Sequence, residues 1–525
     1  MFSISSWNYR GREIKLTAAF AVGLLLIGDG QPARTEPGRS AHALIDEAIS
    51  TLDRKTDVRT LRRIQFKMRL FDRDIVEGEH AGEPYVASLS FGSMADDFAT
   101  GYRLIQTKDP DTGEVIGREL TRDAADQFDG LNHGKPTGRR VTLAPPGWML
   151  GDPFRALLLA DKAPDLRLEP DETLHGARQR VVTFTAQGVH AKVLIDATSH
   201  LITAAETRLG FSHATSSEIA YNAMGDVRER TEFQLWDEAG GLRYPTQWDT
   251  WRNDVPLRTL SIDGPPILDP AWDPADVLPS ETLKQVASLA ATDLNRIALA
   301  TPISSAPDPH RGIEEIAPGV VQIPGSWFVT LVRQDDGVVI IDAPISSGYS
   351  AEVIAEAGRR FPGLPIKALV TSTSFFWHVG GVREYVARRI PIYVRDVNVA
   401  TLRQIIEAPH GLVPDRLSQA PTKPILRAVS GPLEIGHGRN RVVVMPNALA
   451  VEPMLMTHIP DARILHTGEM IQPLGSGGAF LYPESLIEVR DSIAAAHLHV
   501  DRLIGMHMSP RPFSDLEAAI AKAGA

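Results

Sequence analysis

The pattern of hydrophobic and polar positions changes near residue 310, and the chain before that point predicts strands. From about Thr60 to Leu268, short runs of β-branched and aromatic residues alternate with turn signals. QRVVTFTA at 179–186 and AKVLIDA at 191–197, for example, are separated by a short stretch that contains Gly188. Runs of this length and spacing are typical of a mostly antiparallel sheet.

Two helices are expected to accompany these strands. Apolar residues recur at helical spacing over Ser40 to Asp53, and DPFRALLLA at 152–160 has a similar pattern. The aromatic side chains near residue 240 are expected to pack across strands rather than to face a ligand. These aromatic residues are Trp236, Tyr244, Trp248 and Trp251.

After residue 310 the pattern alternates strands with helices. GVVQIP at 319–324, WFVTLVRQ at 327–334 and VVIIDAP at 338–344 predict strands, and Asp335-Asp336-Gly337 signals a hairpin between the last two. The helical run SAEVIAEAGRRF at 350–361 then precedes another strand, IKALVTS. Strands flanked by helices on this scale indicate an α/β layered domain.

The chain therefore divides into four expected segments. They are a signal peptide over 1–33, a mostly β domain over 36–268, a proline-rich helical connector over 269–309, and an α/β domain over 310–525.

The expected signal peptide begins with basic residues at Arg10, Arg12 and Lys15, and an apolar run from Leu16 to Gly28 follows. An uncleaved membrane anchor is the alternative, but the run is short for a span of about 20 residues. We expect cleavage near Ala33, export to a periplasmic compartment, and a mature chain without a membrane span.

Composition narrows the possible partners and chemistry. The 525 residues include no cysteine, and the formal net charge is −11. The excess of acidic groups argues against nucleic acid as a main partner, so a small-molecule substrate or a hydrophobic ligand is expected. The lack of cysteine excludes disulfides, thiolate zinc ligands and a cysteine nucleophile.

Three expected strands of the α/β domain end close to a residue that could carry chemistry. His378 follows the strand at 366–372, Glu469 follows RILHTG, and His507 ends RLIGMH. Functional side chains are often placed at the ends of strands in α/β layers. One carboxylate and two imidazoles would suit a divalent ion such as zinc.

These residues and the order of elements resemble the metallo-β-lactamase fold superfamily. The resemblance implies an αββα sandwich over about 210 residues and a metal-assisted hydrolase activity. The family pattern is a strand ending in Thr, then His-x-His-x-Asp-His before a Gly-Gly helix start, with a later lone His, an Asp in a TGD-like turn and a last His. His378 before Gly380-Gly381, Glu469 in HTGE and His507 occupy matching positions.

The departures from the family pattern imply a degenerate, reduced site. Thr373 and Phe375 stand at the first two histidine positions, and Trp377 stands at the aspartate position. The middle histidine position falls near Ala450, where there is no histidine, and Glu469 replaces the later aspartate. What remains is His378, Glu469 and His507, a set that would hold one zinc or other divalent ion and activate a water molecule. Thr373, Phe375, Phe376 and Trp377 would line the substrate pocket.

Two functions follow as hypotheses. The first is an exported hydrolase with a mononuclear metal site that acts on an ester, a lactone or a similar carbonyl substrate. The second is a non-catalytic protein of the same fold that binds a hydrophobic ligand or a protein partner. For His378 alone, a hydrogen bond to backbone at a helix start is the ordinary alternative to metal binding.

Other histidines are weaker candidates. His458 and His466 lie on strands beside the HTGE turn, and either could substitute as a ligand, although we expect half-exposed strand residues. His310, His410 and His437 lie in expected loops and should be solvated.

Overall fold

The structure is a computed structural model that describes most of the chain. The described residues are 40–53, 55, 57–74, 86–122, 125–132, 135–143, 148–186, 188–210, 225–272, 284, 312–325, 327–447, 453–474, 479–480 and 483–523. The predicted signal peptide, most of the predicted connector, His310 and the position near Ala450 lie outside these residues. The limits of the four segments expected from the sequence therefore remain predictions. Among the helices described, none is long and apolar enough to cross a membrane.

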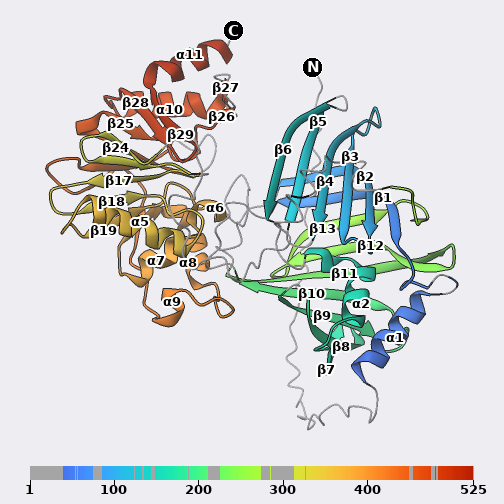
Figure 1. The fold of residues 1–525 in the computed structure, drawn as a ribbon. Coiled ribbons are helices and arrows are strands. Elements are labelled where there is room, and N and C mark those ends of the chain that lie inside the picture. Colours follow the sequence, from blue (N-terminus) through green and yellow to red (C-terminus); the bar gives the residue numbers. More distant parts are fainter. Residues whose placement is uncertain are drawn as a thin grey trace, which may run out of the picture. The chain divides into compact units, whose positions relative to one another are not determined.

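The N-terminal part forms one antiparallel sheet of 14 strands. The strand order is β6 to β1 in descending order, followed by β13 to β7 in descending order. Every pair of adjacent strands in this order is also consecutive in sequence, apart from the pair β1 and β13. Figure 1 shows that β2, β3, β5 and β6 run across the direction of β10–β12, as expected of a strongly twisted sheet. The strands are β1 (Arg63–Asp74), β2 (Val86–Asp97), β3 (Tyr102–Lys108), β4 (Val115–Arg122), β5 (Ala125–Asn132), β6 (Lys135–Leu143), β7 (Arg167–Leu174), β8 (Ala177–Ala186), β9 (Val189–Asp196), β10 (Ile202–Gly210), β11 (Asp226–Ala239), β12 (Leu242–Arg252), β13 (Val255–Ile262) and β14 (Ile267–Leu268).

Both helices expected with this sheet are present and supply its core. Helix α1 (Ala41–Leu52) is capped by Ser40, and α2 (Pro153–Asp161) follows the short helix η1 (Trp148–Gly151) and is capped by Asp152. Their apolar faces join the buried side chains of the sheet in one cluster. Tyr244 and Trp248 are buried in that cluster, which confirms the expectation that they pack.

The C-terminal part contains two further large sheets. A seven-stranded sheet has the order β15 to β21, and a six-stranded sheet has the order β22-β23-β24-β25-β28-β29. The strands are β15 (Glu314–Ala317), β16 (Val320–Ile323), β17 (Val329–Arg333), β18 (Val338–Ile341), β19 (Ile366–Val370), β20 (Ile392–Arg395), β21 (Leu426–Val429), β22 (Leu433–Ile435), β23 (Val442–Pro446), β24 (Leu455–Ile459), β25 (Ile464–His466), β28 (Arg502–Gly505) and β29 (Met508–Pro512), with a small hairpin of β26 (Pro473–Leu474) and β27 (Ala479–Phe480).

Three apolar clusters hold these sheets and their helices together. One cluster joins side chains of both sheets, including Val339 of β18 and Val444 of β23. A second joins the seven-stranded sheet to α5, α7 and α8, and a third joins the six-stranded sheet to α10 and α11 (Figure 1). The helices are α5 (Ser347–Arg360), α6 (Phe376–Val379), α7 (Val382–Ala387), η5 (Asp396–Asn398), α8 (Val399–Glu407), α9 (Arg416–Gln419), η6 (Pro460–Ala462), α10 (Pro483–Ala495) and α11 (Phe513–Ala523). The protein is thus a mostly-sheet α/β protein with large antiparallel sheets.

Candidate metal site

The three residues expected to hold a metal come from strand ends of both C-terminal sheets. His378 lies in the one-turn helix α6, a short distance after β19 of the seven-stranded sheet. Glu469 follows β25, and His507 follows β28 of the six-stranded sheet. Strands β25 and β28 are parallel neighbours, so their carboxyl ends place Glu469 and His507 at the same edge.

The turns that carry Glu469 and His507 are joined by backbone hydrogen bonds. The Thr467 amide donates to Ile504 at 2.8 Å, and the Met506 amide donates to Gly468 at 3.0 Å. Gly468 has a φ of 65°, and a Cβ added there would lie 3.0 Å from the Ser372 Cβ. A glycine is therefore needed where this turn approaches the loop before His378.

The three side chains converge on one small volume. His378 Nδ1 lies 2.9 Å from Glu469 Oε2, and His507 Nε2 lies 3.4 Å from Glu469 Oε1. The two imidazole rings are 5.5 Å apart at an interplanar angle of 72°. One ligand atom from each residue lies within 4.8 Å of the other two. His378 and Glu469 are buried, and His507 is partly exposed.

The atoms that face each other in this group have no hydrogen-bond partner outside it. His378 Nδ1, Glu469 Oε2 and His507 Nε2 are all buried, and Gln472 donates to the other carboxylate oxygen at 3.3 Å. Buried polar atoms are normally satisfied, because leaving one unpaired costs about 1–3 kcal/mol. Buried ligand atoms whose only neighbours of this kind are one another therefore fit a bound cation.

The electrostatics favour the protonation states that a metal needs. Burial lowers the pKa of His378, an effect that the Glu469 carboxylate partly offsets, so the imidazole is neutral near pH 7. Burial raises the pKa of Glu469, but contact with the two imidazoles outweighs this and brings it to about 2. An ionised carboxylate and a neutral imidazole are the forms that bind a divalent ion.

Aromatic side chains surround His378. The ring of Phe375 lies 6.0 Å and that of Trp327 lies 5.4 Å from the imidazole, and Trp327 is 5.6 Å from Trp377. Trp327, which precedes β17, was not among the sequence candidates. Its only sequence signal was a tryptophan directly before an apolar strand.

The other expected pocket residues lie differently. Phe376 packs against the cluster between the seven-stranded sheet and its helices. Thr373 is buried, and its hydroxyl accepts a hydrogen bond from the Phe375 amide at 3.2 Å, so it shapes the loop. Residues 376–379 of this loop form one helical turn, α6.

A buried polar cluster near Glu469 was missed by the sequence reasoning. Asp342 accepts hydrogen bonds from the Ser372 amide at 2.7 Å and the Ser372 hydroxyl at 3.0 Å. His466 Nε2 lies 3.6 Å from Asp342, and its Nδ1 accepts from the Gly468 amide at 3.1 Å. The available signal was Asp342 at the end of the strand VVIIDAP, a position comparable to that of Glu469.

Two expectations for the remaining histidines were wrong. His458 and His466 are buried rather than half-exposed, because β24 and β25 are interior strands with apolar clusters on both faces. His410 is buried rather than solvated, and it is close enough to Asp415 to help lower the pKa of that carboxyl, mainly together with Arg383. His437 is exposed, as expected. His378 contacts the Glu469 side chain, which replaces the backbone hydrogen bond considered for it.

Comparison with known proteins gives structural neighbours. Neither a protein-family model nor a curated protein matches the chain. The metallo-β-lactamase FIM-1 from Pseudomonas aeruginosa, solved in a mono-zinc form, is 16% identical, with a TM-score of 0.30 over 40% of this chain and 94% of its own. TMB-1 is 17% identical, with a TM-score of 0.31 over 41% of this chain and 98% of its own. A metallo-β-lactamase from Pontibacter korlensis is 12% identical, with a TM-score of 0.30 over 40% of this chain and 96% of its own. Part of this chain is thus similar to solved metallo-β-lactamases.

Proposed function

We propose that the C-terminal part is a metal-dependent hydrolase with an αββα sandwich and one divalent ion, best zinc, held by His378, Glu469 and His507. The proposed substrate is a small molecule with an ester, lactone or similar carbonyl group. The observation that carries the proposal is the convergence of His378, Glu469 and His507, each of which places one ligand atom within 4.8 Å of the other two.

The sandwich is supported by the distribution of core residues. One apolar cluster contains side chains of both sheets, and each sheet contributes to a separate cluster with helices. Two sheets that share a core and carry helices on their other faces would form four layers.

The donor set fits a catalytic rather than a purely structural ion. Three protein ligands leave a coordination position for water or substrate. When bound, a divalent ion would polarise the substrate carbonyl and lower the pKa of a water molecule. Glu469 supplies the one negative charge of the set. The neutral His378 ring places its Nδ1 atom beside the Glu469 carboxylate.

The aromatic side chains would bind the apolar part of the substrate. Phe375, Trp327 and Trp377 form a continuous set of rings beside His378. Rings at this position exclude water and strengthen electrostatic interactions with the reacting group.

The first test is the metal content of full-length protein purified without chelator or metal-affinity resin. We expect about one zinc per chain, the stoichiometry of a three-ligand site. His378→Ala and His507→Ala should each lose most of it, because removal of a ligand weakens a mononuclear site. His437→Ala is the matched control, because His437 is exposed and distant in sequence from the three ligands.

The zinc-loaded protein should then hydrolyse members of an ester and lactone panel, with activity lost in both ligand variants and kept in His437→Ala. Protein that takes up no metal even after loading would contradict the proposal. Metal binding without any turnover on the panel would contradict the hydrolase assignment.

A second function is favoured by the aromatic loop itself. Thr373, Phe375 and Trp377 replace metal-binding side chains of the family pattern. The Phe375 ring lies beside His378, and the Trp377 ring contacts Trp327, which also lies beside the imidazole. A non-catalytic protein that binds a hydrophobic ligand or a protein partner at these rings is therefore the alternative. It predicts ligand-induced quenching of tryptophan fluorescence that persists in His507→Ala.

Export belongs to the same proposal and is supported by the basic and apolar pattern of residues 10–28. N-terminal sequencing of protein recovered outside the cytoplasm should give a start near Arg34, and an intact Met1 would contradict it.

A further inference from the structure

The N-terminal sheet contains a cavity that the proposed hydrolase chemistry does not use. Its volume is about 140 Å³, and side chains of β1–β3 and β11–β13 together with Gly151 line it. A cavity of about 150 Å³ is large enough to bind benzene, so this space can hold one small ring.

The lining changes from apolar to charged along the paired strands β11 and β12. Every second residue of a strand points to the same face, and three successive cross-strand pairs on one face are spaced in this way. The pairs are Phe233–Trp248, Thr231–Thr250 and Glu229–Arg252, and all of these residues except Phe233 line the cavity. A ligand that lies along the strands therefore meets an apolar pair, a hydroxyl pair and an ion pair in turn.

The apolar part of the lining suits an aromatic ring better than water. Met68, Met94, Trp248 and Leu260 line the cavity and are buried in the core of the sheet. The Trp248 indole N–H donates to the Pro245 carbonyl at 3.0 Å, so it has no proton left for a water molecule. A buried water needs two to four polar partners, whereas thioether sulfur and indole both make favourable contacts with aromatic rings.

A pair of threonine hydroxyls follows directly on this apolar part. Thr231 Oγ1 and Thr250 Oγ1 are 3.0 Å apart, so one hydroxyl donates to the other, and the hydroxyl that accepts keeps its own proton for a ligand. Trp248 and Thr250 are two residues apart on β12, about 7 Å along the strand, so a ring beside Trp248 can place its substituent at the hydroxyls. A Cβ added at Gly151 would lie 3.0 Å from Thr231 Oγ1, so a larger residue there would crowd this position.

The charged groups of β11–β13 in the lining are already paired. Arg252 donates to Glu229 at 2.5 Å, and Arg258 donates to Asp72 at 2.5 Å. Both ion pairs join residues that are cross-strand partners, so the sheet itself holds each guanidinium at its carboxylate.

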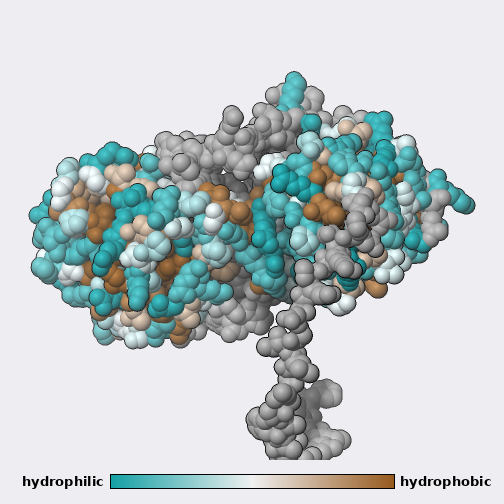
Figure 2. Space-filling view, turned by 90° about the horizontal axis from the view of Figure 1, so that it is seen from below, coloured by the Kyte–Doolittle hydropathy of each residue, from teal (hydrophilic) through white to brown (hydrophobic). Residues whose placement is uncertain are grey.

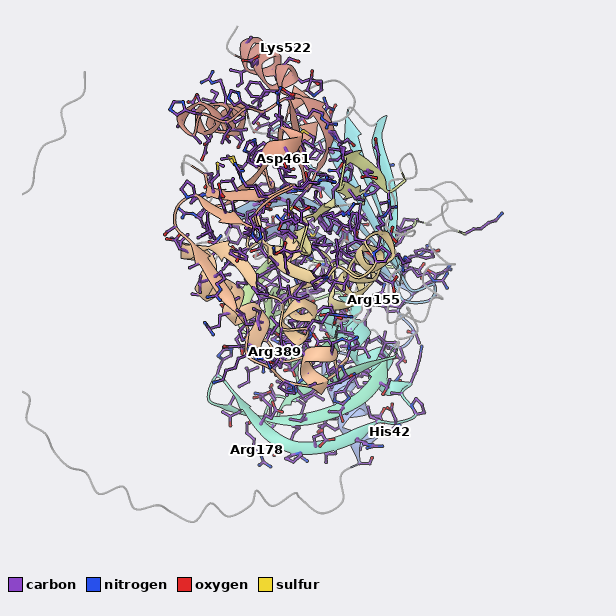
Figure 3. All side chains as sticks on the ribbon, turned by 90° about the vertical axis from the view of Figure 1, so that its left-hand side faces the viewer. His42, Arg155, Arg178, Arg389, Asp461 and Lys522 are labelled. Carbon is purple, nitrogen blue, oxygen red and sulfur yellow. The ribbon has the colours of Figure 1, made fainter. Side chains whose placement is uncertain are left out.

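The third arginine of the lining is paired as well. Arg103 donates to Asp96 at 3.0 Å and to Asp152 at 2.8 Å. Arg155, labelled in Figure 3, lies on α2 and donates to the same Asp96 at 2.6 Å. A charged ligand would have to separate one of these buried ion pairs or remain without a counter-charge, and both are strongly unfavourable. The cavity therefore favours a neutral ligand.

From this order of side chains we propose that the N-terminal sheet binds a small neutral aromatic alcohol, with its ring beside Met94 and Trp248 and its hydroxyl at Thr231 and Thr250. The residues of this site belong to the N-terminal part, and none of them is a candidate metal ligand. Binding should therefore not depend on metal.

The test uses four probes with the same ring and different substituents: benzyl alcohol, apolar toluene, anionic benzoate and cationic benzylammonium. Each is titrated into the full-length chain by calorimetry with a chelator present, so that no probe is bound through a metal. We expect a benzyl alcohol dissociation constant of about 1 mM or tighter, and toluene about fivefold weaker because it makes no hydrogen bond. Neither charged probe should bind detectably at about 10 mM.

The hydroxyl pair is tested by replacing both threonines together. Thr231→Val combined with Thr250→Val keeps the shape of the lining, and the fold should tolerate it because both partners of the hydrogen bond are removed at once. This double variant should bind benzyl alcohol about fivefold more weakly and toluene within about twofold of wild type. Retained toluene binding shows that the cavity is still formed. Thr185→Val, at an exposed threonine of β8 outside the lining, should leave both probes unaffected.

A second variant tests the cavity itself. Leu257→Trp fills part of the space and should abolish binding of benzyl alcohol and toluene alike. Leu89→Trp, on the exposed surface of β2, is the matched control and should bind both probes as wild type does.

Four results would overturn the proposal. It fails if benzyl alcohol does not bind at about 10 mM, or if benzoate or benzylammonium binds as tightly as benzyl alcohol. It also fails if the double valine variant keeps the wild-type ratio of the two neutral probes, or if Leu257→Trp binds them as tightly as wild type.

Discussion

Asp342 and His466 show how burial sets charge beside the candidate metal site. Burial raises the pKa of Asp342 from 3.8 to about 7, an effect that two hydrogen bonds from Ser372 only partly offset. Burial also lowers the pKa of His466 from 6.5 to about 3. At pH 5 the folded pair therefore holds its one proton on Asp342, whereas the unfolded pair holds it on the histidine.

Because of this exchange, the Asp342–His466 pair contributes nothing to the change of folding stability with pH. Between about pH 4 and pH 6.5 the folded and unfolded pair bind the same number of protons. The raised pKa of Asp342 alone would make stability fall as pH rises from 3.8 to about 7. The lowered pKa of His466 alone would make stability rise with pH from about 3 to 6.5. In the wild-type protein the two slopes cancel.

Replacing one residue of the pair should make folding stability depend on pH, with opposite signs for the two replacements. Relative to wild type, Asp342→Asn should gain stability as pH rises from 4 to 6.5, because His466 remains and must lose its proton to fold. His466→Gln should lose stability over the same range, because Asp342 remains and must gain one. Each slope is at most about 1.4 kcal/mol per pH unit. Urea unfolding at several pH values measures it.

The exposed Glu434→Gln is the control for this series and should follow the wild-type pH profile. If stability changes with pH in the same direction in Asp342→Asn and His466→Gln, the buried pair does not hold its proton as described.

At the scale of elements, α7 must approach α5 closely to place His378. Gly381 is the N-cap of α7, and a Cβ added there would lie 2.0 Å from Ser350 Oγ and 2.7 Å from the Ser346 carbonyl oxygen. Gly381→Ala should therefore destabilise the protein by about 1–3 kcal/mol, because the backbone carbonyl cannot rotate away. It should also reduce metal content, since α6 directly precedes this glycine.

Gly358 gives a control of opposite sign on α5. It is exposed and helical, and a Cβ added there meets nothing within 4 Å. Gly358→Ala should stabilise the protein by about 0.5–1 kcal/mol. Urea unfolding of both variants compares them. If Gly381→Ala is as stable as wild type, the approach of α7 to α5 is looser than described.

Strands that are rich in apolar residues were predictable from the sequence. Strands that are stabilised mainly by pairing with a neighbouring strand were not. VVIIDAP and QRVVTFTA predicted β18 and β8, whose side chains are mostly buried. Strand β7 was missed, because RLEPDETL contains a proline and four charged residues. It is an edge strand, where proline and charge are tolerated, and pairing with β8 holds it.

The same limit applies to the candidate site. His378, Glu469 and His507 could be proposed together, because each follows a recognisable strand and each matches a motif position. Trp327 could not, because its contact with His378 depends on how the ends of non-adjacent strands of the seven-stranded sheet come together in space. Only the tertiary structure brings the Trp327 ring within 5.4 Å of His378.

At the scale of the molecule, the described core residues fall into two groups along the chain. The main cluster of the 14-stranded sheet contains residues from 41 to 268, and the clusters of the two smaller sheets contain residues from 313 to 520. On the face drawn in Figure 2, exposed hydrophobic residues form small patches among hydrophilic ones, an ordinary surface pattern. Each group therefore has the buried apolar side chains that a cooperative folding unit needs.

Two such units should unfold in two separable thermal transitions, and zinc should shift only one of them. A ligand that binds only the folded state stabilises it by about 2.7 kcal/mol at 100 times its dissociation constant. Zinc should therefore raise the midpoint of the transition that belongs to the C-terminal sheets. Scanning calorimetry of the full chain with and without zinc measures the shift.

One variant assigns the zinc-sensitive transition to its part of the chain. His507→Ala should remove the zinc shift, because His507 lies between strands β28 and β29 of the C-terminal part. A single transition that zinc raises as a whole would mean that the two groups of core residues unfold as one unit. In that case zinc bound to the C-terminal part would also stabilise the N-terminal sheet, through global unfolding.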